Sequence, residues 1–138
     1  MKIEHIGIAV QDLAKSKALF SAIFGQPPYK DEHVESEHVD VSFFQLADSK
    51  IELLQATSPE SAIAKHIEKR GEGMHHIAFE VPDIHAAMER MKGEGYRVLN
   101  EAPKRGADNK LIFFLHPKDT NGVLVELCQE ISVSAESE

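Results

Sequence analysis

The sequence contains an internal repeat, and this repeat restricts the possible folds more than any other feature. The segment HIGIAVQDL begins at His5, and the similar segment HIAFEVPDI begins at His76. A second pair of similar segments is KIELLQ at 50–55 and LVELCQ at 124–129. The two members of this pair occur in the same order as those of the first pair and are separated by nearly the same number of residues. Chance is a poor explanation for two ordered matches. We therefore expect two copies of one supersecondary unit within this chain.

Each copy is expected to have the element order β-α-β-β-β, which is typical of the α+β class. Alternating apolar residues predict strands, and Asp12 and Asp83 are suitable N-caps for the helices that follow the first strands. The first copy is predicted to have strands at 2–10, 28–34, 38–46 and 50–56 and a helix at 13–24. The second copy is predicted to have strands at 74–81, 96–100, 110–116 and 122–129 and a helix whose apolar stripe is Ile84, Ala87, Met88 and Met91.

The predicted domain organisation follows from these elements. Residues 1–56 form the first module, and residues 74–130 form the second. The linker at 57–73 is expected to hold a helix that starts at Ser58-Pro59, because proline is favoured at the first helical position. The polar tail 131–138 is expected to be disordered.

Two histidines and two glutamates recur at matching positions of the repeat. Side chains alternate between the faces of a strand, so His5 and His76 lie opposite the apolar residues that should pack against helices. The same argument places Glu52 and Glu126 on that face. Small residues beside the histidines (Gly7, Ala9 and Ala78) leave a hollow there. Two imidazoles and two carboxylates suit Zn²⁺, Co²⁺, Mn²⁺, Ni²⁺ or Fe²⁺, so a shared metal site is predicted.

Simpler interpretations apply to the other candidate residues. His75 lies on the opposite face from His76, so we interpret it as structural. Cys128 shares the face of Glu126, but a buried thiol is more often a small apolar filler than a nucleophile. The net charge is −8 with no basic cluster, and no apolar run is long enough to span a membrane. Nucleic acid and membrane are therefore excluded as expected partners, and a reducing cytoplasmic location is predicted from the single cysteine.

The sequence resembles the vicinal oxygen chelate superfamily (glyoxalases, bleomycin-resistance proteins and dioxygenases), and within it the methylmalonyl-CoA epimerases. The resemblance rests on HIGIAV at 5–10, IELLQ at 51–55, SPESAIAKHIEKRGEGMHHIAFEV at 58–81 and FLHPKDTNGVLVEL at 114–127. It implies two βαβββ modules that form one cupped, incompletely closed mixed β-sheet with helices on the outside. It also assigns the metal ligands to His5, Glu52, His76 and Glu126.

The activity that this resemblance implies is inversion of C2 of methylmalonyl-CoA through a metal-chelated enolate. The implied cofactor is one divalent ion (Co²⁺, Zn²⁺, Mn²⁺ or Ni²⁺), the substrate is an acyl-CoA, and the assembly is a homodimer. Glu52 and Glu126 are the expected proton carriers, because Val41 stands where some relatives have a catalytic glutamate. His116 and Lys118 are expected to contact the substrate, and Lys104 and Arg105 are further candidates for the CoA phosphates.

Other functions of the same fold remain open at this stage. The first alternative is a glyoxalase I-like lyase or isomerase acting on a thiol–dicarbonyl adduct. Another is a non-enzymatic protein that binds a small molecule, although such proteins usually lack an intact set of ligands. An extradiol dioxygenase needs two histidines, one carboxylate and open iron positions, and two carboxylates argue against it.

Overall fold

The structure is a computed structural model that describes residues 1–132, so most of the predicted disordered tail lies outside the described residues. The described chain divides into two compact units, His5–His75 and a second unit made of Met1–Glu4 and the residues from His76 onward. Within residues 1–132, no helix is both long and apolar enough to cross a membrane.

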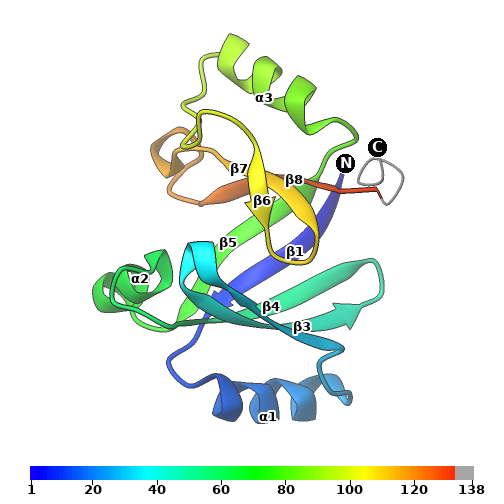
Figure 1. Cartoon of the computed structure of the whole chain (residues 1–138), viewed down its shortest axis with the longest axis vertical. Helices are drawn as coiled ribbons and strands as arrows, with labels where there is room; N and C mark the ends of the chain where they lie inside the picture. The colour runs from blue at the N-terminus through cyan, green and yellow to red at the C-terminus, as the bar shows by residue number, and fades with distance from the viewer. Residues whose placement is uncertain (133–138) are drawn as a thin grey trace. The chain divides into compact units, whose positions relative to one another are not determined.

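Each copy of the repeat forms four strands and one helix, which confirms the predicted β-α-β-β-β order (Figure 1). The first copy and the linker contain β1 (Lys2–Ala9), α1 (Leu13–Phe24), β2 (Lys30–Val34), the 3₁₀ turn η1 (Glu35–Glu37), β3 (Val39–Leu46), β4 (Ser49–Ala56) and α2 (Ala62–Arg70). The second copy contains β5 (Gly73–Glu80), α3 (Ile84–Gly93), β6 (Lys104–Gly106), β7 (Lys110–Phe114), the 3₁₀ turn η2 (Pro117–Asp119) and β8 (Val125–Glu130).

The strands of the first copy are ordered β2-β3-β4-β1, and those of the second copy are ordered β5-β8-β7-β6. In the first copy β1 is parallel to β4, whereas β2, β3 and β4 are successively antiparallel. The second copy repeats this pattern, with β5 parallel to β8 and β6, β7 and β8 successively antiparallel. In both copies, therefore, the first and last strands are direct neighbours although about 45 residues of chain separate them.

Side-chain caps set the start of the two repeated helices, as the sequence predicted. Asp12 accepts a hydrogen bond from the N–H of Lys15, and Asp83 accepts two, from the N–H groups of His85 and Ala86. These bonds satisfy backbone donors that have no partner within the helix. Gly25 ends α1 with φ 69°, a left-handed conformation that costs glycine little.

One face of each half-sheet packs against its own helix. In the first copy, Val10, Phe44 and Leu53 form the buried cluster beneath α1, and Phe20 and Phe24 of the helix pack onto it. In the second copy, the predicted stripe of α3 (Ile84, Ala87, Met88 and Met91) is buried with Phe113, Leu115 and Leu127. Burial of one such side chain contributes about 1.5–3 kcal/mol.

The prediction of a strand at 96–100 is wrong. Only Val98 forms an isolated bridge, to Leu115, and the strand next to β7 is instead β6. The ladder stops because the N–H of Phe114 donates to the side-chain oxygen of Asn100 rather than to a backbone carbonyl. Gly106 allows β6 to approach closely, since a Cβ there would lie 2.9 Å from Cδ1 of Ile112.

The predicted start of the linker helix at Ser58-Pro59 is also wrong, because α2 begins three residues later. Ser61 is its N-cap, and its hydroxyl accepts the N–H of Ile63. Ser58 instead starts a separate turn, in which its carbonyl accepts the N–H of Ser61. Pro59 therefore precedes the helix and does not occupy its first position, because the hydroxyl that caps α2 belongs to Ser61.

Candidate metal centre

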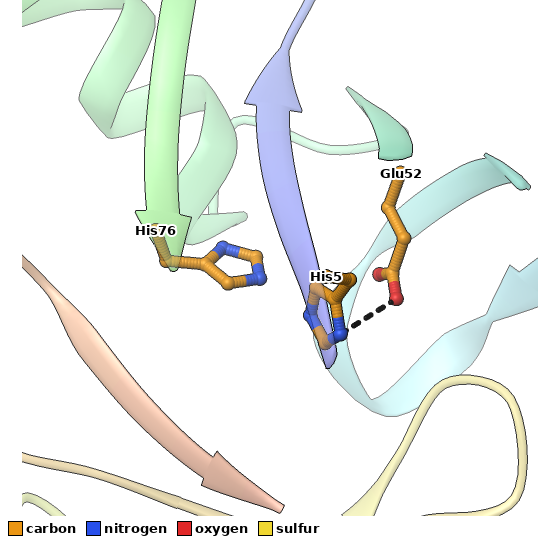
Figure 2. A group of neighbouring side chains, drawn as sticks. All are labelled: His5, Glu52 and His76. Carbon is orange, nitrogen blue, oxygen red and sulfur yellow. Dashed lines mark ion pairs between the residues drawn. The ribbon is translucent and has the colours of Figure 1, made fainter. Parts of the chain in front are cut away.

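His5 and Glu52 form a buried pair in the first copy of the repeat. In the register of β1 and β4, Gly7 lies beside Glu52, so His5 is a diagonal neighbour of Glu52 on the same face. Because Gly7 has no side chain, it does not separate the side chains of His5 and Glu52. His5 Nδ1 lies 3.2 Å from Glu52 Oε2, as the dashed line in Figure 2 marks. Each of the two residues is only 4% exposed.

His76 and Glu126 form the equivalent pair in the second copy. Ala78 of β5 lies beside Glu126 of β8, which repeats the place of Gly7 beside Glu52. His76, which Figure 2 shows on β5, has Nε2 3.4 Å from Glu126 Oε1. Both residues are buried. The repeat therefore places an imidazole next to a carboxylate twice, by the same strand register.

Both pairs lie on the face of their half-sheet that does not contact α1 or α3. Their sequence neighbours on β4 and β8 point the other way, as the alternation predicted. Ile51 and Leu53 join the cluster under α1, and Val125 and Leu127 join the cluster under α3. The predicted division of faces is thus confirmed for these strands.

Apolar residues surround each pair. In the first copy, Phe43 lies opposite Glu52, and Val41, opposite Leu54, is fully buried. Val41 has no group that transfers a proton. The adjacent residues of β3 face the other way, and Ser42 donates its hydroxyl to Asp31. Val41 thus excludes water beside the pair.

In the second copy, Ala78, Ile112 and Cys128 form a buried cluster with Phe114 packed against it. Burial raises the pKa of the Cys128 thiol, and the nearby carboxylates raise it further. The thiol donates to the carbonyl of Phe79 at 3.5 Å. A neutral, buried thiol is a poor nucleophile, which agrees with the predicted role of Cys128 as a filler.

His75, the neighbour of His76, has a structural environment. Its ring packs edge-on against His66 of α2, with ring centroids 5.0 Å apart. Burial, and to a smaller extent the charge of His66, lowers the pKa of His75 to about 4. His75 is therefore neutral near pH 7 and packs against α2, which agrees with its interpretation as a structural residue.

The predicted substrate contacts lie at the η2 turn. His116 caps this turn, and its Nδ1 accepts the N–H of Lys118 at 3.1 Å. An accepting Nδ1 implies that Nε2 carries the proton and is available as a donor. That His116 and Lys118 contact a substrate stays a prediction, as does the role of Lys104 and Arg105.

An ion pair that the sequence did not indicate holds η2 in place. Arg97 donates to Asp119 through its backbone N–H, through Nε at 3.1 Å and through Nη2 at 2.7 Å. The side-chain hydrogen bond from Arg97 lowers the pKa of Asp119 to about 2. The arrangement fixes the turn that leads into β8, the strand that carries Glu126.

Replacement of Asp119 by asparagine is expected to destabilise the protein near pH 7. Because the pKa of Asp119 is lower in the folded chain than in the unfolded chain, its contribution is present above about pH 4 and is lost as the pH falls through about 2. The difference in urea midpoint between wild type and D119N should therefore be constant from pH 7 to pH 4 and shrink below it. A difference that grows on acidification would contradict this assignment.

Two other features of the site were missed by sequence reasoning. Glu4 and Lys110 form a buried ion pair, with Nζ 3.7 Å from Oε2. Lys110 lies on the same face of β7 as Ile112 and Phe114. A lysine on a face that is otherwise apolar was the sequence signal that could have indicated a buried ion pair. Phe114 also contacts His76, with ring centroids 5.9 Å apart, and nothing in its local sequence indicates this contact.

Comparison with known proteins identifies the family of this chain. A sequence profile described as the glyoxalase/bleomycin resistance protein/dioxygenase superfamily matches residues 4–114. The chain belongs to this superfamily. An ethylmalonyl-CoA/methylmalonyl-CoA epimerase of Cereibacter sphaeroides is 43% identical over 130 residues, which cover 93% of this chain and 97% of that protein.

Solved structures of superfamily members show the same fold. A variant of Streptomyces coelicolor methylmalonyl-CoA epimerase, in complex with 2-nitronate-propionyl-CoA, matches with a TM-score of 0.90 and 37% identity over 96% of each chain. A structure of methylmalonyl-CoA epimerase in complex with methylmalonyl-CoA and NH₄⁺ matches with a TM-score of 0.89 and 38% identity over 96% of each chain. These similarities confirm the predicted membership in the superfamily and the predicted fold class.

Proposed function

We propose that this chain is a metal-dependent isomerase that inverts C2 of methylmalonyl-CoA. The observation that carries the proposal is the repeated pair of buried residues, His5 with Glu52 and His76 with Glu126. The similarity to epimerases over almost the whole chain supports the reaction class. The substrate class, an acyl-CoA thioester, follows from the ligands named for the two solved relatives.

The residues fit a divalent cation. Glu52 and Glu126 are both 4% exposed, and burial of a carboxylate is costly unless positive charge offsets it. His5, Glu52 and His76 are a group of ligand types that could hold a metal ion, and Glu126 is not part of this group. We propose Glu126 as the fourth ligand because it lies beside His76. Imidazole nitrogen and carboxylate oxygen together suit Zn²⁺, Co²⁺, Mn²⁺ and Ni²⁺. The donor set does not select one of these ions.

The chemistry required at C2 is the removal of a proton and its return to the other face. The four proposed ligands would hold the divalent cation, and the Lewis acidity of that cation would stabilise negative charge on the thioester oxygen. The apolar residues near the pairs, such as Val41 and Ile112, exclude water and so strengthen the electrostatic interactions within the site.

Glu52 and Glu126 are the proposed proton carriers. Epimerisation needs one base and one acid, and the repeat supplies one carboxylate from each copy. In each pair one carboxylate oxygen lies near an imidazole nitrogen, at 3.2 Å for Glu52 and at 3.4 Å for Glu126.

The proposal is tested by incubating the metal-loaded protein with either epimer of methylmalonyl-CoA in D₂O. Deuterium is expected to enter C2 while the epimers interconvert, because the proton taken from C2 exchanges with solvent before it is replaced. Mass spectrometry measures the incorporation, and chiral analysis measures the interconversion. Metal-stripped protein is the control and should show neither change.

Three results would contradict the proposal. Absence of exchange at C2 with each of Zn²⁺, Co²⁺, Mn²⁺ and Ni²⁺ would exclude the epimerase reaction. Turnover of a thiol–dicarbonyl adduct under the same conditions would instead identify a glyoxalase I-like enzyme. Tight binding of an acyl-CoA without any exchange would indicate a non-enzymatic binding protein.

A further inference from the structure

We propose that Phe114 is a positioning residue that holds the His76 imidazole in the orientation facing Glu126. The inference rests on the proposed function, because the proposed metal site requires a nitrogen of His76 to face the cation. Phe114 does not touch a reacting atom in this proposal. It acts through His76, and its role is to reduce the number of orientations that the imidazole adopts.

The contact between the two rings has a defined geometry. The ring centroids of His76 and Phe114 lie 5.9 Å apart, and the ring planes are nearly perpendicular, at 88°. Perpendicular edge-to-face packing is a preferred arrangement of aromatic rings. A rotation of the imidazole about its Cβ–Cγ bond would break this arrangement, so the contact restricts the side-chain torsion that decides where Nε2 points.

The backbone of β7 places Phe114 at this position. Phe114 lies directly opposite Glu126 in the antiparallel register of β7 and β8, so the two side chains share a face. Its N–H donates to the side chain of Asn100 at 2.9 Å, and its carbonyl accepts the N–H of Leu99 at 2.8 Å. Because these bonds use only the backbone of Phe114, a change of its side chain leaves them intact.

The first copy of the repeat has a phenylalanine at the corresponding place, but its ring has different contacts. Phe43 lies opposite Glu52, as Phe114 lies opposite Glu126. The Phe43 ring packs on Tyr29, with centroids 5.9 Å apart, and Lys30 Nζ lies 5.0 Å from its centroid. The repeat thus supplies the residue type twice, and the contact of Phe114 with His76 is a feature of the second copy.

The first test measures the His76 ring directly in the metal-free protein. In ¹H–¹⁵N spectra that detect imidazole nitrogens, Phe114→Leu is expected to shift and broaden the His76 signals, because leucine has no ring current and no preferred perpendicular packing. His76→Asn assigns the signals. Phe114→Tyr keeps the aromatic ring and is expected to retain the wild-type pattern.

The second test measures the affinity for Co²⁺ by calorimetry. Phe114→Leu is expected to weaken binding by about 2- to 12-fold, the factor that corresponds to one aromatic pair. Phe113→Leu is the matched control, since Phe113 is the adjacent residue of β7 and is buried in the cluster under α3. It should lower the melting temperature but leave the Co²⁺ affinity and the His76 signals unchanged.

Unchanged His76 signals in Phe114→Leu would overturn the inference, and so would an equal loss of Co²⁺ affinity in Phe113→Leu. Failure of the wild-type protein to bind Co²⁺ or any of the other three ions would instead reject the proposed metal site. The spectra of the metal-free protein still decide the role of Phe114 in that case, so the two failures are distinguishable.

Discussion

Replacement of His76 by alanine is expected to remove the bound metal and to abolish epimerisation. His76 is 7% exposed and lies 3.4 Å from Glu126, so alanine deletes a buried ligand that no nearby solvent replaces. Metal affinity should fall more than about 100-fold, because loss of groups that only support metal ligands already costs about 10- to 100-fold. Metal content by elemental analysis and turnover of methylmalonyl-CoA are the two measurements.

The chain offers a matched control in the adjacent histidine. His75 faces the other way and packs on His66, so His75→Ala removes an imidazole without touching the proposed site. This variant should bind metal as the wild type does and should lose only stability, measured as its melting temperature. If His76→Ala stays fully metallated and active, the proposed ligand set is wrong.

Replacement of Glu126 by glutamine is expected to reduce epimerisation by about 10²- to 10⁴-fold, the usual contribution of one acid–base group. Glutamine keeps the shape of the side chain and one oxygen, but it cannot accept a proton. Because Glu52 remains, deuterium exchange should persist for one epimer of methylmalonyl-CoA without conversion to the other. Comparing exchange and interconversion for the two epimers in D₂O separates these events.

The matched control is Glu130→Gln, on the same face of β8 but exposed and at the far end of the strand. It should leave both exchange and interconversion unchanged. Equal loss of exchange for both epimers in Glu126→Gln, with metal content retained, would show that Glu126 and Glu52 do not act on opposite faces of C2. Wild-type epimerisation in Glu126→Gln would remove Glu126 from the mechanism.

Features that depend on local sequence were predicted well. The helix starts at Leu13 and Ile84 depend on the aspartates that precede them, and capping is an interaction over three residues. The faces of β1, β4, β5 and β8 depend only on alternation, which a buried strand enforces. His5, Glu52, His76 and Glu126 could therefore be selected without any coordinates.

Features that depend on contacts between distant segments were missed. The segment at 96–100 has a strand-like pattern, but the Asn100 side chain binds the N–H of Phe114 and ends the ladder. The pairing of Arg97 with Asp119 joins two loops that are far apart in sequence. Such contacts leave no periodic trace in the sequence, since each partner is an ordinary polar residue of a loop.

The sequence by itself determined that there are two equivalent copies, and that each contributes one histidine and one glutamate to the face of the sheet away from α1 and α3. The reason is that a duplication and the alternation of apolar residues along a strand can both be recognised from the order of residues alone. Only the tertiary structure decided which atoms meet: the parallel register sets Gly7 beside Glu52 and Ala78 beside Glu126, and the β7–β8 register sets Phe114 against His76. Register is fixed by packing and by hydrogen bonds between strands that are distant in the chain. The free energy of these contacts depends on both strands, so it cannot be inferred from one segment alone.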